Sequence, residues 1–283
     1  MHWQTARFLI DLSRPRVMGI VNLTPDSFSD GGQHASAAAG IAHCHRLVEQ
    51  GADILDLGAE SSRPGAATLS DEEEWDRLAP VLTEAVKLGL PISVDTCKPE
   101  IMRRALAAGA DIINDIHALE RPGALAAVAA KSGICLMHMR GEPQTMQGLA
   151  DYEDVTAEVT RYLDARLQAA QAAGIARERV VLDPGYGFAK NTAHNLALLR
   201  RQPELLALGR PLLAGLSRKR MLGDLTGRAP NERMAASIAA ALLAVQSGAS
   251  LVRVHDVAET VDALKVWMAV SENRPQVSKE QNS

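Results

Sequence analysis

The stretch GADILD at residues 51–56 recurs twice along the chain, as GADIIN at residues 109–114 and GASLVR at residues 248–253. In each copy a Gly-Ala pair follows a run with helical spacing, an apolar pair predicts a strand, and the sixth residue is polar. Short apolar strands that alternate with helices are typical of a parallel sheet. The repeat therefore predicts an α/β fold whose strands end on polar side chains.

The same pattern extends outward to the whole chain. Strand-like runs lie at residues 17–22, 53–57, 91–95, 111–114, 133–138, 179–183, 211–215 and 250–254, with helical stretches between them. Eight alternating units fit a closed (β/α)8 TIM barrel better than an open doubly wound sheet, and no GxGxxG motif follows the first strand. We expect one barrel domain over residues 1–270, with a short strand within residues 5–12 and a disordered polar tail at 271–283.

Composition narrows the class of protein. The 283 residues are 47% hydrophobic and 23% charged, which is typical of a soluble globular protein, and the net charge of −4 gives no bulk attraction for nucleic acid or an anionic membrane. Cys44, Cys97 and Cys135 are an odd set without CxxC spacing, which argues against a disulfide framework or a thiolate zinc site. Since no long apolar segment is present, we expect a cytoplasmic protein that binds neither nucleic acid nor membrane.

Polar residues stand at the ends of six predicted strands, namely Asn22, Asp56, Asp95, Asn114, Asp183 and Arg253. The carboxyl ends of barrel strands are where this fold builds its active sites. Any one of these residues could instead cap the next helix, because Asp and Asn are favoured N-caps. A buried carboxylate without a partner is costly, however, so the set predicts a ligand, a metal or mutual pairing.

Cationic residues gather in the loops that follow the same strand ends. Arg63 lies in ESSRPG at residues 60–65, Lys219 and Arg220 lie in GLSRKR at residues 215–220, and His255 follows Arg253 by two residues. SRKR alone could be a solvated basic turn, but loops after the seventh and eighth strands of this fold commonly bind phosphate. Deep acids below a cationic rim predict a substrate with an N–H-rich head and a phosphate tail.

Eight motifs in order resemble the dihydropteroate synthase family over about residues 16–270. They are GIVNLTPDSFSDGG (19–32), GAESSRPGA (58–66), SVDT (93–96), IINDI (112–116), LMHMRG (136–141), LDPGYGFAK (182–190), GLSRK (215–219) and VRVHD (252–256). The resemblance implies a homodimeric, pterin-binding barrel that uses Mg2+. The implied reaction is a transferase step of folate biosynthesis, in which 6-hydroxymethyl-7,8-dihydropterin diphosphate and 4-aminobenzoate give 7,8-dihydropteroate and diphosphate.

The resemblance also implies a role for individual residues. The pterin would bind to Asp95, Asn114, Asp183 and Lys219. The diphosphate would bind to Asn22, Arg63, Arg253 and His255, with Asn22 also the ligand of Mg2+. The 4-aminobenzoate pocket, where sulfonamides are expected to compete, would consist of Phe28, Ser62, Pro64, Phe188 and Ser217. Catalysis by dissociative loss of diphosphate would rest on Asn22, Arg63, Lys219, Arg253 and His255. Ser62 departs from the Thr of many relatives but keeps the hydroxyl.

Two other classes of function remain open. A pterin-binding methyltransferase domain would share the deep acids, but it handles no diphosphate and does not need Arg63, Arg253 and His255 together. A non-catalytic pterin-binding or scaffold protein would be expected to lose a loop polar group such as Asn22 or Lys219, and the chain retains both. Of the remaining histidines, His138 at the end of the fifth strand could line the site or simply fill the barrel, and we expect it to line the site. The Ala-rich run 235–244 is expected to be core or a dimer face.

Overall fold

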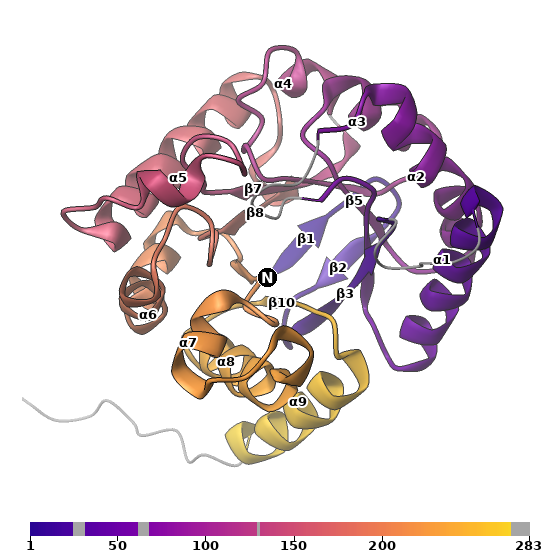
Figure 1. Ribbon diagram of the computed structural model, residues 1–283. Helices are drawn as coiled ribbons and strands as arrows, with labels where there is room; N and C mark the ends of the chain where they lie inside the picture. The colour runs from indigo at the N-terminus through magenta and orange to yellow at the C-terminus, as the bar shows by residue number, and fades with distance from the viewer. Residues whose placement is uncertain (25–31, 62–67, 129–130, 273–283) are drawn as a thin grey trace, which may run out of the picture.

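The computed structural model of the chain describes residues 1–24, 32–61, 68–128 and 131–272 and contains an eight-stranded parallel barrel (Figure 1). The strands are β3 (Arg16–Asn22), β4 (Ile54–Gly58), β5 (Ile92–Asp95), β6 (Ile112–Asp115), β7 (Gly133–Met137), β8 (Val180–Asp183), β9 (Leu213–Ala214) and β10 (Leu251–Val254). They pair in the order β8-β7-β6-β5-β4-β3-β10-β9, and a bridge between Leu182 and Leu212 closes the ring. The predicted (β/α)8 barrel is confirmed.

Helices surround the strands on the outside of the ring (Figure 1). They are α1 (Gly32–Glu49), α2 (Asp71–Ala85), α3 (Pro99–Ala107), α4 (Ala124–Ala127), α5 (Val155–Ala172), α6 (Thr192–Arg200), α7 (Arg220–Thr226), α8 (Met234–Gln246) and α9 (Val257–Glu272). Among the described residues, no helix is both long and apolar enough to cross a membrane. Sequence periodicity did not predict α7, and it predicted a longer helix around α4.

Polar residues at the ends of the loops fix where the helices begin. Ser70 accepts a hydrogen bond from the backbone N–H of Glu73, whose side chain accepts one from the backbone of Ser70 in return. Asn191 caps α6 by accepting from the backbone N–H of His194. Because these caps satisfy backbone groups that the first helical turn leaves unpaired, each loop leaves its strand and enters its helix in a defined geometry.

The N-terminal segment differs from the single strand expected within residues 5–12. It forms a hairpin of β1 (His2–Gln4) and β2 (Leu9–Asp11), because the chain reverses where the backbone N–H of Thr5 donates to the carbonyl of Phe8 at 2.8 Å. At the other end of the chain, residues 271–272 belong to α9. The rest of the predicted disordered tail, residues 273–283, lies outside the described residues.

The hairpin closes the amino end of the barrel, and it lies within the ring of strands in Figure 1. Trp3 is fully buried, and its indole N–H donates to the carbonyl of Arg179 at 2.9 Å. Its apolar neighbours come from the N-terminal segment and from seven strands of the barrel, namely Ile10, Leu12, Met18, Ile54, Ile112, Cys135, Val181, Leu213 and Leu251. Since this end is plugged, solvent and ligands reach the barrel from the carboxyl ends of the strands.

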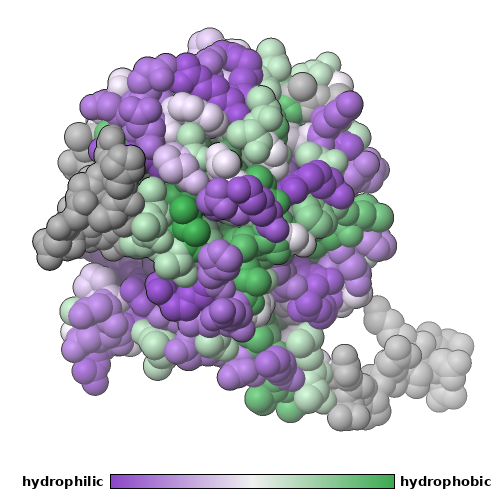
Figure 2. Space-filling model, turned by 90° about the vertical axis from the view of Figure 1, so that its right-hand side faces the viewer, coloured by the Kyte–Doolittle hydropathy of each residue, from purple (hydrophilic) through white to green (hydrophobic). Residues whose placement is uncertain are grey.

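The outer surface of the last two helices is partly apolar. Met234 and Leu243 of α8 are 40% and 53% exposed, and Val266 and Val270 of α9 are 66% and 61% exposed. Figure 2 shows hydrophobic residues at the lower end of the molecule, where α9 lies. Exposed apolar side chains that gather on one face often mark a contact with another protein.

We predict that Trp3→Ala lowers the stability of the barrel while leaving its open end intact. Removing a fully buried Trp costs about 3–5 kcal/mol, which lowers the midpoint of thermal unfolding by about 10 °C. Thermal unfolding followed by circular dichroism measures this. Leu9→Ala, on the same hairpin at a side chain that is 65% exposed, serves as the control and should change the midpoint little. An unchanged midpoint in Trp3→Ala would contradict the plug.

Candidate active site

A cavity of about 1350 Å³ opens at the carboxyl ends of the strands. The predicted site residues that line it are Asn22, Asp95, Asn114, Asp183, Phe188, Ser217, Lys219, Arg253 and His255. The other predicted site residues, Phe28, Ser62, Arg63 and Pro64, lie outside the described residues. A cavity of this size exceeds what one drug-sized ligand needs, so it has room for two substrates side by side.

Arg253 lies between two carboxylates at the floor of this cavity. Its Nε donates to Oδ2 of Asp56 at 2.6 Å, and its Nη2 donates to Oδ2 of Asp95 at 2.8 Å. The amide of Asn114 donates to the same oxygen of Asp56 at 3.2 Å. Burial raises the pKa of Asp95 to about 7, although Arg253 opposes the shift. Asp56 is fully buried and holds Arg253, a role that the resemblance does not supply.

Asp183 and Lys219 form the second polar group of the cavity. One oxygen of Asp183 accepts from the backbone N–H of Gly185 at 2.7 Å. Burial raises the pKa of Asp183, against the opposing effects of that hydrogen bond and of Lys219. Burial, together with Arg253, lowers the pKa of Lys219 to about 8. The ammonium of Lys219 lies 4.1 Å from the centre of the Phe188 ring, a cation–π contact that joins the deep polar groups to an aromatic wall.

His255 is a neutral hydrogen-bonding group rather than one of the rim cations that the sequence suggests. Burial lowers its pKa to about 3, and the neighbouring cations Arg218 and Arg253 add to the effect. Its Nδ1 lies 3.0 Å from the hydroxyl of Ser217, which also accepts from the His255 backbone N–H. A hydroxyl that donates to Nδ1 leaves the proton on Nε2, so the ring offers an N–H donor.

The arginines of the SRKR motif have different environments. Arg218 is among the residues that line the cavity, and its guanidinium bonds to Asp256 at 2.5 Å. Its backbone is in the left-handed region, with φ of 59°. Arg220 has a side chain that is 85% exposed and lies 3.8 Å from Asp224. The solvated-turn interpretation therefore describes Arg220, whereas Lys219 enters the cavity.

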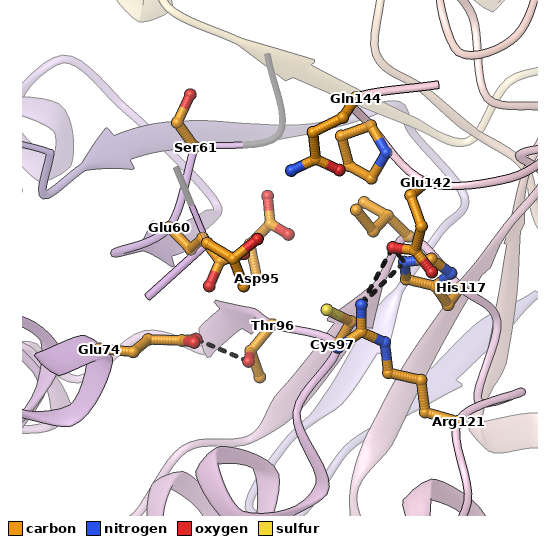
Figure 3. A pocket seen from close by; sticks show the side chains of 13 residues that line it. Glu60, Ser61, Glu74, Asp95, Thr96, Cys97, His117, Arg121, Glu142 and Gln144 are labelled. Atoms are coloured by element: carbon orange, nitrogen blue, oxygen red, sulfur yellow. Dashed lines mark hydrogen bonds and ion pairs between the residues drawn. The ribbon is translucent and has the colours of Figure 1, made fainter. Parts of the chain in front are cut away.

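A smaller cavity of about 40 Å³ adjoins the large one at Asp95 (Figure 3). On one side Glu74 accepts from the hydroxyl of Thr96 at 2.7 Å, and on the other side His117 and Arg121 both contact Glu142. These groups satisfy one another across the loops that follow β5, β6 and β7. The smaller cavity is therefore lined by polar side chains that already bond to one another, and it adjoins the large cavity as a minor recess.

Lys98 joins the loops beside that smaller cavity. Its buried ammonium contacts Glu60 at 2.5 Å and Glu74 at 2.7 Å, and it donates to the carbonyl of Leu69 at 2.7 Å. Burial alone would lower the pKa of Lys98, but the hydrogen bonds to Glu60 and Glu74 outweigh it and raise the pKa. Glu60 and Leu69 stand on either side of residues 62–67, so Lys98 ties together the two ends of that segment.

The prediction that His138 lines the cavity is wrong for the described part of the chain. His138 is buried behind the wall, edge-on to the Tyr162 ring with centroids 4.9 Å apart. Its Nδ1 lies 2.9 Å from the ammonium of Lys190, a residue at the end of the LDPGYGFAK motif for which sequence reasoning supplied no role. Asp56 and Lys190 are thus two polar residues of the site region to which sequence reasoning gave no function.

No group of three or more His, Cys, Asp or Glu side chains that could hold a metal ion occurs in the described residues. Magnesium in phosphate-binding sites is commonly held by substrate phosphates and waters with only one or two protein oxygens. The amide oxygen of Asn22, at the end of β3 and on the cavity wall with Arg253 and His255, is a ligand of the required kind. The residues present are therefore compatible with a metal that arrives with a phosphorylated substrate.

Comparison with known proteins agrees with this site. A family model described as pterin binding enzyme matches residues 18–255. The dihydropteroate synthase of Neisseria meningitidis serogroup B is 55% identical over 279 residues, covering 96% of this chain and 98% of that protein. The structure of Xanthomonas albilineans dihydropteroate synthase with 4-aminobenzoic acid is 55% identical, with a TM-score of 0.91 and coverage of 97% and 99%.

A second structure of the Xanthomonas albilineans enzyme, in complex with 7,8-dihydropteroate, is 50% identical, with a TM-score of 0.86 and the same coverage of 97% and 99%. These matches extend over almost the whole of both chains, and the family model begins in β3 and ends at His255. The barrel and the residues at its open end therefore lie within the matched region. The chain belongs to the dihydropteroate synthase family of pterin binding enzymes.

Proposed function

We propose that the chain condenses 6-hydroxymethyl-7,8-dihydropterin diphosphate with 4-aminobenzoate to give 7,8-dihydropteroate and diphosphate. The observation that supports this most directly is the grouping of Asp95, Asn114, Asp183 and Lys219 beside Arg253 in one cavity. The complexes of the Xanthomonas albilineans enzyme with 4-aminobenzoic acid and with 7,8-dihydropteroate support the same substrate and product. One barrel domain, residues 1–270, would perform the whole reaction.

The deep half of the cavity is suited to a pterin ring. A 2-aminopyrimidinone edge presents adjacent N–H donors, which a carboxylate accepts as a pair. One oxygen of Asp183 accepts from Gly185, which leaves the other oxygen for the pterin. Asp95 can bind the pterin when Arg253 is displaced or when the carboxylate is shared between Arg253 and the ring. Asn114 supplies an amide, which both donates and accepts hydrogen bonds, and Lys219 supplies an ammonium donor. These groups can bond the ring carbonyl and the ring nitrogens of the pterin.

The outer half suits the diphosphate and the aromatic acid. Arg253 supplies a guanidinium and His255 a neutral N–H donor, and we assign Arg63, which is outside the described residues, to the same anion. Asn22 would hold Mg2+ through its amide oxygen, and the ion would neutralise charge on the leaving diphosphate. Phe188 and Ser217 line the side assigned to 4-aminobenzoate, together with Phe28, Ser62 and Pro64 of the loops that are not described. Sulfonamides, which mimic this acid, would compete there.

The chemistry follows from the charges that these residues hold. The bond between the pterin methylene and the diphosphate oxygen breaks first, and the electron pair leaves with the diphosphate. Arg253, Lys219 and the His255 N–H stabilise the charge that develops on the leaving group. The neutral amine then attacks the exposed methylene, a C–N bond forms, and the amine proton is lost to solvent or to diphosphate. A neutral arylamine is nucleophilic without a strong base, which agrees with the neutral His255.

The proposal includes a homodimer and a cytoplasmic setting. The exposed apolar residues of α8 and α9 supply a surface for a second copy of the chain. Cys44, Cys97 and Cys135 are all free and buried thiols, which is typical of a reducing compartment.

One assay separates this function from its two rivals. The protein is incubated with Mg2+, the pterin diphosphate and 4-aminobenzoate, and both dihydropteroate and diphosphate are measured. We expect dihydropteroate and diphosphate in equal amounts. Without 4-aminobenzoate no dihydropteroate should form, and diphosphate should form only if water attacks the methylene in place of the amine. Pterin binding without turnover would favour a scaffold protein. Methyl transfer from a methylated tetrahydropterin, with no use of the diphosphate, would favour the methyltransferase.

We predict that the affinity for a bare pterin rises with pH. In the free protein the pKa of Asp95 is about 7, so the carboxyl is largely protonated at pH 6 and must lose its proton before it accepts pterin N–H groups. Binding should therefore strengthen about tenfold between pH 6 and pH 8. Calorimetry with 6-hydroxymethylpterin measures this, and Asp95→Asn should bind more weakly with a smaller pH dependence. Equal affinity of the unsubstituted protein at both pH values would refute the assignment.

We also predict that Leu243→Glu combined with Val266→Glu converts a dimer to a monomer. Both side chains are more than half exposed on neighbouring helices, and a pair of carboxylates on an apolar interface is poorly solvated. Analytical ultracentrifugation of the full chain gives the mass directly. Leu9→Glu, on the hairpin at the barrel's closed end, is the control and should stay dimeric. A monomeric unsubstituted protein, or a dimeric double variant, would rule out this surface.

A further inference from the structure

The loop of residues 184–191 connects the two substrate regions of the cavity. It begins directly after Asp183, contains Phe188, and ends at Asn191, the N-cap of α6. Its backbone is unusual, because Gly185, Gly187 and Ala189 have φ of 71°, 83° and 48°. The alanine in the left-handed region carries backbone strain that a glycine would avoid. Such a loop needs contacts from outside its own backbone to keep its shape.

Lys190 supplies those contacts from a buried position. Its side chain is 3% exposed, and the ammonium donates to the carbonyl of Gly185 at 2.9 Å, to the carbonyl of Phe188 at 3.0 Å and to Nδ1 of His138 at 2.9 Å. Three acceptors match the three donors of an ammonium group and favour the charged form, whereas burial lowers the pKa of Lys190 well below its ordinary value. Lys190 thus ties two points of its own loop to the end of β7.

The partner histidine is itself fixed. His138 packs edge-on against Tyr162, and burial with the nearby Lys190 and Arg140 lowers its pKa to about 2, so its Nδ1 remains an acceptor. The loop passes close to the same residue, since a Cβ added at Gly185 would meet the His138 carbonyl at 1.9 Å. Lys190 is therefore held against a rigid wall rather than against another loop.

The far side of the loop has a separate support. The amide oxygen of Asn195 accepts from the Gly187 backbone N–H at 2.8 Å, and its nitrogen donates to the backbone carbonyl of Lys190 at 3.2 Å. This support holds the loop to α6 but makes no contact with the carbonyl of Phe188. The backbone N–H of Phe188 donates to the Gly185 carbonyl at 3.1 Å, and Phe188 packs against a buried apolar cluster that includes three methionines. The Lys190 side chain adds the contact to the Phe188 carbonyl, and so contributes to the position of Phe188 relative to Lys219.

We propose that Lys190 is a positioning residue of the reaction, whose buried ammonium fixes the 184–191 loop so that Phe188 presents its ring to Lys219 and to the aromatic acid. This inference rests on the proposed function, because it uses the assignment of Phe188 to 4-aminobenzoate. Lys190 is among the residues that line the cavity, but its ammonium is directed to its own loop and to His138, so it acts through Phe188. Asp183 stands at the end of β8 and has only one hydrogen bond from the loop, at Gly185, so the effect falls on the aromatic acid more than on the pterin.

The test compares KM values for the two substrates in Lys190→Met, which keeps most of the side-chain length and removes all three donors. We expect the KM for 4-aminobenzoate to rise about tenfold or more, and the KM for the pterin diphosphate to change less than about threefold. Arg7→Met is the matched control, because it removes a cation from buried Asp111 at the closed end of the barrel. The control should lose stability without a change in either KM.

A double-mutant cycle with Phe188→Ala shows whether Lys190 acts through that ring. If it does, Lys190→Met adds little to the KM for 4-aminobenzoate once Phe188 is removed. Full additivity, or a lower melting temperature with both KM values unchanged, would overturn the proposal. Should Lys190→Met fail to fold, Lys190→Gln can replace it, because it retains two N–H donors. It should also raise the KM for 4-aminobenzoate more than the KM for the pterin diphosphate, but by a smaller factor. Absence of dihydropteroate from the unsubstituted protein would refute the proposed function instead.

Discussion

A guanidinium held between two buried carboxylates sets the charge balance of the open end of the barrel. Asp56 and Asp95 would be costly to bury alone, and Arg253 offsets that cost with two charge-assisted hydrogen bonds. One oxygen of Asp56 remains buried without a hydrogen-bond partner in the described structure. Arg253 bonds Oδ2 of Asp95, so a ligand that donates N–H groups to this carboxylate shares it with Arg253, and occupation of the deep half alters the surroundings of the cation that serves the outer half. The two halves of the cavity are therefore electrostatically connected.

The closed parallel barrel is what brings these three residues together. Arg253 is separated from Asp56 by 197 residues and from Asp95 by 158 residues, yet β10, β3, β4 and β5 are consecutive strands of the ring. Side chains that point inward at the ends of these strands meet above the apolar plug. The cluster forms only when the ring has closed, so the integrity of the site depends on long-range pairing rather than on any local motif.

The sequence was most informative where a pattern is local. Alternation of strands and helices predicts the barrel, and polar residues at strand ends predict Asp95, Asn114 and Asp183 as cavity residues. The pattern could not assign a protonation state to His255, because its neutral form depends on burial and on Arg218 and Arg253, which come from the folded arrangement.

Reasoning from the sequence also failed where a contact is directional. A lysine at the end of LDPGYGFAK has no periodic or compositional signal that it turns inward, so the three hydrogen bonds of Lys190 could not be foreseen. His138 was assigned to the wrong side of the cavity wall for the same reason, since strand alternation does not distinguish a lining residue from one behind it. The N-terminal reversal at Thr5 depends on a local hydrogen bond that apolar spacing does not record.

The plug at the closed end has a consequence for how the chain reaches its native state. Trp3 is synthesised before any strand of the barrel, yet its indole donates to Arg179, which is added 176 residues later. The N-terminal hairpin therefore has no complete docking surface until most of the barrel has left the ribosome, and its apolar face must stay exposed or be sheltered in the meantime. Contacts between such distant residues slow folding because the chain between them must first be ordered. Trp3, which closes the amino end of the barrel, is therefore synthesised before the strands and packs only after most of them are present.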